Sequence, residues 1–368
     1  KPDLSMAQEL RAINPKLTIQ IDHRLTDKLP LISSDGDYDQ HLIDKVHSVI
    51  ADSFVGLHHH DEFSLKDGLG TIDQLISLLK AQKRSFCCVT NHGSVGGWIK
   101  QYNACKEAGI KPIFGCEAYY SPYRGDDPEE KKKHRSANHL LLLAKTTIGA
   151  NNIIKIHNDA QLNGFYYTPR VNRDAIEKWG SGIISSTTCM AGYIPRALMN
   201  NEWDKAREWW DFCKQAFDEY YVELQIIEFE AQRDLNRRLI KFAREVGGEL
   251  ILSADSHYLF PEHTEAHDLM MYMRQGKTII DATESEDTVW DFDVRNLHYR
   301  DAREMREVFD NGFTDKRGDE FPPLKDDLFT DEIFNKAMAK TREIAISVDT
   351  IDLSHPPTLP KLYDDGDK

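Results

Sequence analysis

Residues 54–68 read FVGLHHHDEFSLKDG, a short apolar run followed by a group of residues that can bind metal. If the apolar run is a β-strand, side chains two positions apart share one of its faces. His58 and His60 can then reach one metal ion together, while His59 points the other way. Asp67 lies in the loop that leaves the same strand. Two histidines with this spacing can also be solvated surface residues, so the interpretation depends on the rest of the chain.

Short apolar runs alternate with amphipathic stretches from residue 54 onward, which is typical of β/α proteins. Seven segments are predicted to be strands: 54–58, 87–90, 112–119, 139–144, 182–186, 220–225 and 249–253. Helices are predicted at 72–83, 97–108, 174–179, 203–217, 231–246, 262–274, 301–309 and 331–348. The carboxylate of Asp174 is expected to cap its helix. Seven strands with intervening helices favour a barrel, whose active site would lie at the carboxyl ends of the strands.

Residues able to bind metal recur where the predicted strands end. They are His92, Glu117, Cys189, Asp255 and His257. His139 instead precedes its apolar run, which is explained if the strand 139–144 runs antiparallel beside 112–119. We therefore expect all these side chains to meet His58 and His60 at one rim of the barrel.

The bulk composition excludes some classes of protein. The 368 residues carry a formal charge of −15, which argues against a protein that coats DNA through a broad basic surface. A nucleic-acid enzyme is still allowed, because bound metal ions would add positive charge where a phosphate sits. We find no apolar run of membrane-span length and no secretion signal. The six cysteines form no CxxC pair. A reducing, cytoplasmic location without membrane contact is therefore predicted.

A series of segments resembles, in order and spacing, successive motifs of the PHP domain of bacterial DNA polymerase III alpha subunits. The resemblance extends over about residues 53–320, and its segments read FVGLHHHDEFSLKDG, TNHG, AGIKPIFGCEAYYSP, HLLLLAK, GFYYTPR, CMAGYIPRALM, SADSHYL and EAHDLMMYMRQGKT. It implies an α/β fold, a distorted seven-stranded (β/α)7 PHP barrel that holds two or three divalent metal ions. Asn91 stands where the family more often has Asp. This position is expected to contact a ligand residue and not to bind metal itself.

The resemblance also implies the metal ligands and the division of the chain. The implied ligands are His58, His60, Asp67, His92, Glu117, His139, Cys189, Asp255 and His257. Among them, the implied catalytic residues are His58, His60, Glu117, Asp255 and His257. Mixed nitrogen, oxygen and sulfur ligands suit zinc, manganese or iron better than magnesium or calcium. The expected parts are an N-terminal extension (1–50), a PHP metal-dependent phosphoesterase domain (51–276) and a C-terminal helical extension (277–368) that resembles the connection to a polymerase palm. The chain begins at Lys1, which fits a trimmed product or a piece of a longer protein.

Phosphodiester hydrolysis in a polymerase context predicts 3′–5′ exonucleolytic proofreading of a single-stranded DNA 3′ end. The partners would be DNA and, beyond it, the remainder of a polymerase and replisome proteins. Arg170 and Arg196 are candidates to hold substrate phosphate, or else surface ion pairs. Tyr166 and Tyr167 could stack on an unpaired base or fill loop packing. Two alternatives remain open: a stand-alone PHP phosphoesterase acting on a small phosphomonoester, and a non-catalytic, metal-braced scaffold for a polymerase.

Overall fold

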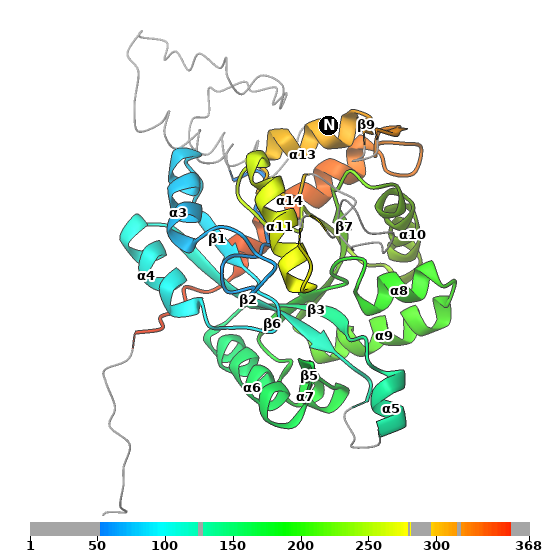
Figure 1. The fold of residues 1–368 in the computed structure, drawn as a ribbon. Helices are drawn as coiled ribbons and strands as arrows, with labels where there is room; N and C mark the ends of the chain where they lie inside the picture. Colours follow the sequence, from blue (N-terminus) through cyan, green and yellow to red (C-terminus); the bar gives the residue numbers. More distant parts are fainter. Residues whose placement is uncertain (1–51, 124–127, 279, 281–295, 315–317, 355–368) are drawn as a thin grey trace, which may run out of the picture.

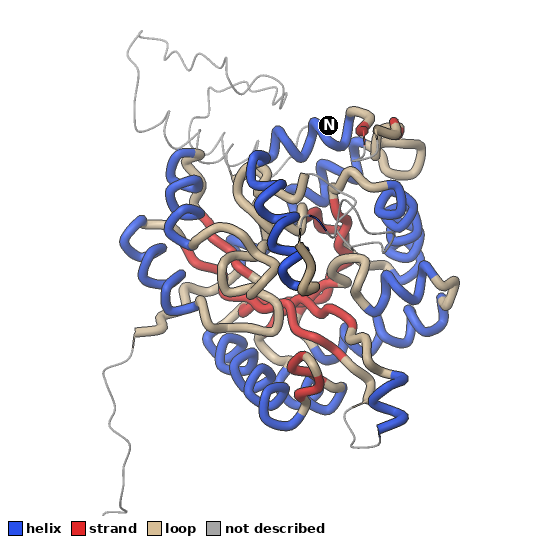
Figure 2. The backbone as a smooth tube through the Cα atoms, in the orientation of Figure 1, coloured by secondary structure: helices blue, strands red, loops and turns tan. Residues whose placement is uncertain are grey.

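A curled sheet forms the centre of the molecule, and helices surround it (Figure 1). The computed structural model describes residues 52–123, 128–278, 280, 296–314 and 318–354. The predicted N-terminal extension, 1–50, therefore lies outside the described residues. Figure 2 shows the strands gathered at the centre with the helices around them. The α/β class predicted from the sequence is confirmed.

The order of the strands follows from their hydrogen-bonded ladders. The sheet runs β4 (Phe165–Tyr166), β5 (Thr168–Val171), β2 (Lys111–Tyr120), β3 (Asn138–Ala144), β6 (Ile183–Ser186), β7 (Glu219–Gln225) and β8 (Leu250–Ser253), and β1 (Phe86–Val89) also pairs with β2. β3 is antiparallel to β2, as the position of His139 predicted, and it is also antiparallel to β6. The pairs β1–β2, β6–β7 and β7–β8 are parallel. A separate small ladder joins β9 (Phe313–Thr314) to β10 (Glu320–Phe321).

The predicted strand 54–58 is wrong, although the neighbouring residues do link the ends of the sheet. Side chains bond the first part of its backbone: Arg84 donates to the Phe54 carbonyl, and the Val55 N–H donates to Thr341 Oγ1 at 3.0 Å. Only its last residue, His58, accepts a backbone hydrogen bond from a neighbouring segment, from the Ser256 N–H at 3.4 Å. Further on, the Thr90 N–H donates to the His59 carbonyl at 2.8 Å. The His60 N–H donates to the carbonyl of Ser256 beyond β8, also at 2.8 Å. Residues 59–60 thus lie between the ends of β1 and β8.

The other six predicted strands and all the predicted helices are present. The helices are α3 (Ile72–Ala81), α4 (Trp98–Ala108), α7 (Arg173–Trp179), α9 (Trp203–Ala216), α10 (Glu230–Val246), α11 (Thr264–Arg274), α13 (Ala302–Asp310) and α14 (Asp331–Ser347), with the short 3-10 turn Pro261–His263 before α11. The Asp174 cap is wrong, because Asn172 accepts from the Ala175 N–H at 3.1 Å while Asp174 lies in the first turn.

The sequence did not predict α5 (Pro128–Lys133), α6 (Thr147–Asn163), α8 (Tyr193–Met199) or the β4–β5 hairpin. α6 is weakly amphipathic, and its asparagines and Gly149 have low helix propensity. Its burial requires glycine, since a Cβ at Gly149 would lie 1.7 Å from the Gly182 carbonyl oxygen. Tertiary packing therefore overrides the local preference.

The interior of the barrel is apolar at the end where the parallel strands begin. Side chains from the strands pack there with three from the end of α14 or just after it, Ile344, Ala345 and Val348. The Lys111 ammonium caps this helix by donating to the carbonyls of Ala345 (3.1 Å) and Ile346 (3.3 Å). α14, from the predicted C-terminal extension, thus closes one end of the barrel interior. None of the described helices is long and apolar enough to cross a membrane.

Replacing Ile344 by alanine should lower the free energy of unfolding by about 2–5 kcal/mol, because a buried side chain is removed and a cavity remains. Ile344 is 2% exposed, whereas Ile346, two residues along α14, is 49% exposed. Ile346→Ala is therefore the matched control, with an expected change within about 0.5 kcal/mol. Urea unfolding followed by circular dichroism measures both. Equal effects would contradict the closure of the barrel by α14.

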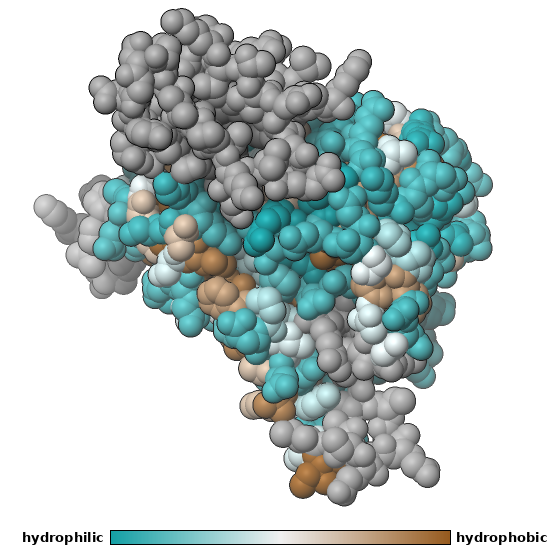
Figure 3. Space-filling model, turned by 90° about the horizontal axis from the view of Figure 1, so that it is seen from above, coloured by the Kyte–Doolittle hydropathy of each residue, from teal (hydrophilic) through white to brown (hydrophobic). Residues whose placement is uncertain are grey.

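One face of the molecule is largely hydrophilic in the residues that the structure describes (Figure 3). Figure 3 shows hydrophilic residues over most of the described part of one face, with hydrophobic residues in small separate groups. This distribution is ordinary for a folded domain, and a site must be sought in the groups that converge inside it.

Candidate metal centre

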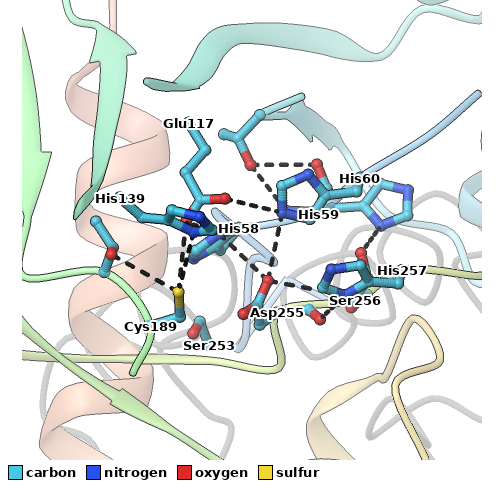
Figure 4. A network of polar contacts seen from close by, with 12 residues as sticks. His58, His59, His60, Glu117, His139, Cys189, Ser253, Asp255, Ser256 and His257 are labelled. Atoms are coloured by element: carbon cyan, nitrogen blue, oxygen red, sulfur yellow. Dashed lines mark hydrogen bonds and ion pairs between the residues drawn. The ribbon is translucent and has the colours of Figure 1, made fainter. Parts of the chain in front are cut away.

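The nine predicted ligands lie together at the end of the barrel where the parallel strands finish. They are His58, His60, Asp67, His92, Glu117, His139, Cys189, Asp255 and His257. Figure 4 shows several of these side chains converging on a common space. His139 reaches it because the antiparallel ladder pairs it with Tyr119, two residues beyond Glu117.

Nitrogen and oxygen atoms of these residues form three overlapping groups, in each of which one ligand atom per residue lies within 4.8 Å of the others. The groups are His58, His60 and Asp255; His92, Glu117 and His139; and His60, His92 and His257. Shared members place the groups side by side. The described residues thus offer up to three adjoining positions for a cation.

Glu117 spans two of these groups through its two carboxylate oxygens. Its Oε1 lies 3.2 Å from His58 Nε2 and 2.9 Å from His139 Nδ1. Its Oε2 lies 2.7 Å from His92 Nδ1. Cys189 Sγ lies 3.3 Å from His139 Nδ1 on the same side. This geometry suits a carboxylate that bridges two ions.

The remaining acids complete the groups on either side. Asp255 Oδ1 lies 3.3 Å from the Nε2 atoms of both His58 and His60. Asp67 Oδ2 lies 2.9 Å from His92 Nε2, and its Oδ1 lies 4.0 Å from His257 Nε2. Each acid therefore faces two imidazole nitrogens.

Buried atoms without hydrogen-bond partners show that the donor set fits metal ions. Among the buried polar atoms of the described residues that make no hydrogen bond, six belong to the predicted ligands: His58 Nε2, His60 Nε2, Asp67 Oδ1, His92 Nδ1, Glu117 Oε2 and Asp255 Oδ1. Buried polar atoms in folded proteins are almost always paired. All six lie at the shared space, where each is 2.7–4.0 Å from an imidazole nitrogen or carboxylate oxygen of another predicted ligand. Divalent cations would satisfy them together.

Groups behind the ligands fix the orientation of their rings. His58 Nδ1 lies 2.8 Å from Glu223 Oε1, and the hydroxyls of Ser186 and Ser253 donate to the same carboxylate at 2.5 Å. His60 Nδ1 is held by Ser64 Oγ at 3.0 Å. Both Nε2 atoms are thereby aimed at the centre, which is the usual arrangement around metal-bound histidines. Sequence reasoning missed Glu223, because a glutamate within a strand carries no signal of its own.

Asn91 and His59 lie outside the ligand set, as expected. Asn91 Nδ2 donates to Asp61 Oδ1 at 2.7 Å, and its Oδ1 accepts from Ser64 Oγ at 2.8 Å. It therefore supports the residue that holds His60. His59 points away from the centre, with its Nδ1 3.0 Å from the Ser256 carbonyl oxygen.

The charges of the site oppose the effect of burial. Burial would raise the pKa of the Glu117 and Asp255 carboxyl groups, but neighbouring histidines hold both pKa values below their ordinary range. Burial would lower the pKa of His92, yet Glu117 and Asp67 raise it to about 10. Asp255 also holds a φ of +46°, a strained backbone conformation of the kind found at functional sites. The raised pKa of His92 favours its protonated form near pH 7 when no metal ion is bound to it.

The stability of the metal-free protein should fall as the pH rises toward 10, because of His92. Its folded pKa, about 10, is above the ordinary value of 6.5, so its contribution is complete below about pH 6.5 and is lost as pH rises through the folded value. The expected loss is on the order of a few kcal/mol. Melting temperatures measured in EDTA between pH 7 and 10 should fall more steeply for the wild type than for His92→Gln. Parallel slopes would contradict the assignment.

A pocket of about 510 Å³ opens over this cluster. Its apolar wall includes Met190, Ile227, Phe229 and Leu297. Arg274, at the end of α11, also lines the pocket, and its Nη1 lies 3.1 Å from Asp67 Oδ2. It is the one lysine or arginine among the described lining residues. Sequence reasoning missed Arg274, because it follows no strand end.

The two arginines predicted to hold substrate do not line this pocket. Arg170 is buried and donates to the carbonyls of His134 (2.7 Å) and Arg135 (2.6 Å). Arg196 Nη1 donates to the Ala137 carbonyl at 2.9 Å. Both guanidinium groups hold backbone near the start of β3. Their predicted contact with substrate phosphate stays a prediction.

Comparisons with known proteins show which family the chain is similar to. Residues 56–226 match the family model described as PHP domain. The chain is 34% identical over 259 residues to DNA polymerase III subunit alpha of Borreliella burgdorferi, which covers 70% of this chain and 22% of that protein. It is 35% identical over 266 residues to the subunit of the same name from Aquifex aeolicus, covering 71% and 23%. The chain thus spans less than a quarter of the length of these relatives.

Similar solved structures are more distant. An amidohydrolase from Chromobacterium violaceum has a TM-score of 0.37 at 14% identity, covering 68% of this chain and 95% of that one. A putative metal-dependent phosphoesterase from Bifidobacterium adolescentis has a TM-score of 0.33 at 14% identity, covering 54% and 86%.

Proposed function

Because this chain contains a PHP domain in residues 56–226, we propose that it hydrolyses phosphodiester bonds with two or three bound divalent metal ions. One observation carries the proposal: imidazole and carboxylate groups of the predicted ligands, six of whose buried atoms make no hydrogen bond, converge on one space below an open pocket. An apolar core would not gather so many buried imidazole and carboxylate groups, since a buried polar group whose hydrogen bonds are not satisfied costs about 1–3 kcal/mol.

Divalent cations bound here would act as Lewis acids, which lower the pKa of a coordinated water and offset charge on a phosphate oxygen. The proposed ligands are the nine residues named above, and the imidazole, carboxylate and thiolate set favours zinc, manganese or iron. His58, His60, Glu117, Asp255 and His257 would lie nearest to the reacting phosphate. Glu117 would connect neighbouring ions, and Glu223 would hold the His58 ring in the orientation that points its Nε2 at the ions.

The proposed substrate is the 3′-terminal nucleotide of single-stranded DNA, and the reaction 3′–5′ exonucleolytic proofreading. Similarity to DNA polymerase III subunit alpha over about 70% of the chain supports a polymerase context, with the remainder of a polymerase as partner. The pocket supports it too, since an apolar wall beside Arg274 suits a base linked to a phosphate. Arg274 would neutralise the phosphate that Asp67 alone would repel.

Substrate choice tests this proposal. The metal-loaded protein is incubated with a 5′-labelled single-stranded oligonucleotide, with the same strand blocked at its 3′ end, and with a small phosphomonoester. We expect stepwise shortening of the unblocked strand and little hydrolysis of the monoester. Preferred hydrolysis of the monoester would favour the stand-alone phosphoesterase. Inactivity on every substrate, with metal content verified by elemental analysis, would favour a metal-braced scaffold.

A further inference from the structure

The β4–β5 hairpin presents aromatic side chains to solvent beside the pocket. Phe165 is 60% exposed and Tyr167 is 68% exposed. Tyr167 forms the turn between the paired residues Tyr166 and Thr168, and its φ is +61°. Bulky residues rarely adopt this left-handed conformation, where glycine is usual. Such strain gathers at functional sites, and here it holds a large ring away from the core.

Basic residues lie next to this turn. The buried Arg170 donates to the carbonyls of His134 and Arg135, and so fixes the end of α5 beside the hairpin. Figure 1 shows α5 and β5 at the same end of the molecule. The guanidinium of Arg135 lies 5.0 Å from the centre of the Tyr167 ring. Lys132 is also exposed in this segment.

The hairpin is continuous with the pocket. Thr168, the residue after Tyr167, lines the pocket, and so does Tyr119, which pairs with Arg170 between β2 and β5. Tyr167 therefore stands one residue outside the pocket, on the outer side of its rim. A chain that ends over the metal ligands could pass across this turn.

We propose that Tyr167, Phe165, Arg135 and Lys132, together called the hairpin surface, bind single-stranded nucleic acid whose 3′ end occupies the pocket. Exposed aromatic rings stack on unpaired bases, and adjacent cations contact the backbone phosphates. Arg135 covers part of the Tyr167 ring and would add its charge to that stacking. Residues 129–135, EEKKKHR, carry four lysine or arginine and two glutamate side chains, an excess of two positive charges in a chain with a formal charge of −15. This inference rests on the proposed function, because it says where on the protein surface the strand of the same substrate lies.

Two features favour nucleic acid over a protein partner. The exposed Tyr167 ring lies against the guanidinium of Arg135, and a ring beside a cation is the usual composition of a surface for single strands. The surface also leads directly to groups suited to phosphate chemistry. A docking site for another protein would not need to adjoin the pocket over the metal ligands.

Tyr167→Gly tests the hairpin surface without a folding penalty, since glycine accepts the left-handed turn. Fluorescence anisotropy of the metal-loaded protein measures binding of a labelled twelve-residue oligothymidylate that is blocked at its 3′ end, which prevents cleavage. We expect Tyr167→Gly to weaken binding about fivefold to a hundredfold, the range for loss of one base stack. Tyr167→Phe should bind like the wild type. Leu162→Ala, also highly exposed nearby, is the control for a nonspecific apolar contact.

A second measurement separates this inference from the proposed function. Hydrolysis of bis(p-nitrophenyl) phosphate, which is too small to span the turn, should be unchanged in Tyr167→Gly, while KM for the oligonucleotide rises and kcat is retained. Arg135→Gln should weaken binding and reduce its salt dependence. If the wild type hydrolyses neither substrate, the proposed function fails while the anisotropy result still stands. Equal oligonucleotide binding by Tyr167→Gly and the wild type would overturn the hairpin surface, and so would wild-type protein that does not bind the oligonucleotide.

Discussion

Replacing both His58 and His60 by alanine should abolish phosphodiester hydrolysis and remove bound metal. The two Nε2 atoms lie 3.3 Å from the same oxygen of Asp255. The two substitutions therefore remove two ligands from the same candidate metal position. Loss of a Lewis acid costs several kcal/mol of transition-state stabilisation, so kcat should fall by more than about 10³-fold. Metal per folded chain, measured by elemental analysis, should fall in parallel.

His59→Ala is the matched control for this double variant. His59 lies between the two ligands in sequence, but its ring points away and packs against Tyr299 at 5.0 Å. It should keep its bound metal, even if the loss of packing lowers its melting temperature. A folded His58→Ala/His60→Ala protein with full activity and full metal content would refute the metal centre.

The contrast between these three histidines explains what the sequence can predict. Alternation along an extended segment requires only backbone geometry, so the opposite directions of His58 and His59 follow from spacing. The regular strand assigned to 54–58 does not follow, because its backbone bonds to side chains of Arg84 and Thr341, far away in sequence. Local pattern predicts direction, whereas distant partners decide whether a ladder forms.

The candidate site was predictable for a related reason. Strands of a β/α barrel finish at one rim, so side chains after successive strands must meet, and ligand types recur there. Residues that reach the site by another route carry no such signal. Arg274 lies at the end of a helix and not after a strand. The sequence around Arg170 likewise does not indicate that its guanidinium donates to backbone carbonyls. Which partner a long charged side chain selects depends on packing that spacing does not encode.

Glu223 gives the second large effect, and it separates positioning from direct binding. Glu223→Gln keeps the shape of the side chain but removes the negative charge that accepts from Ser186, Ser253 and the His58 ring. An amide cannot accept all of these bonds, so the ring loses its fixed orientation. Removing such a partner usually weakens metal binding about tenfold to a hundredfold. We expect this loss in metal titrations, together with activity that excess metal restores.

Restoration by metal distinguishes Glu223 from a ligand, since the variant lacking both His58 and His60 should stay inactive at any metal concentration. Glu219→Gln provides the control on the same strand, because Glu219 pairs with Lys145 at 2.6 Å at the other end of β7. It should bind metal like the wild type. If Glu223→Gln also binds metal with wild-type affinity, the His58 ring does not need its carboxylate partner. The ligand geometry must then be fixed by the metal ions themselves and not by the protein behind them.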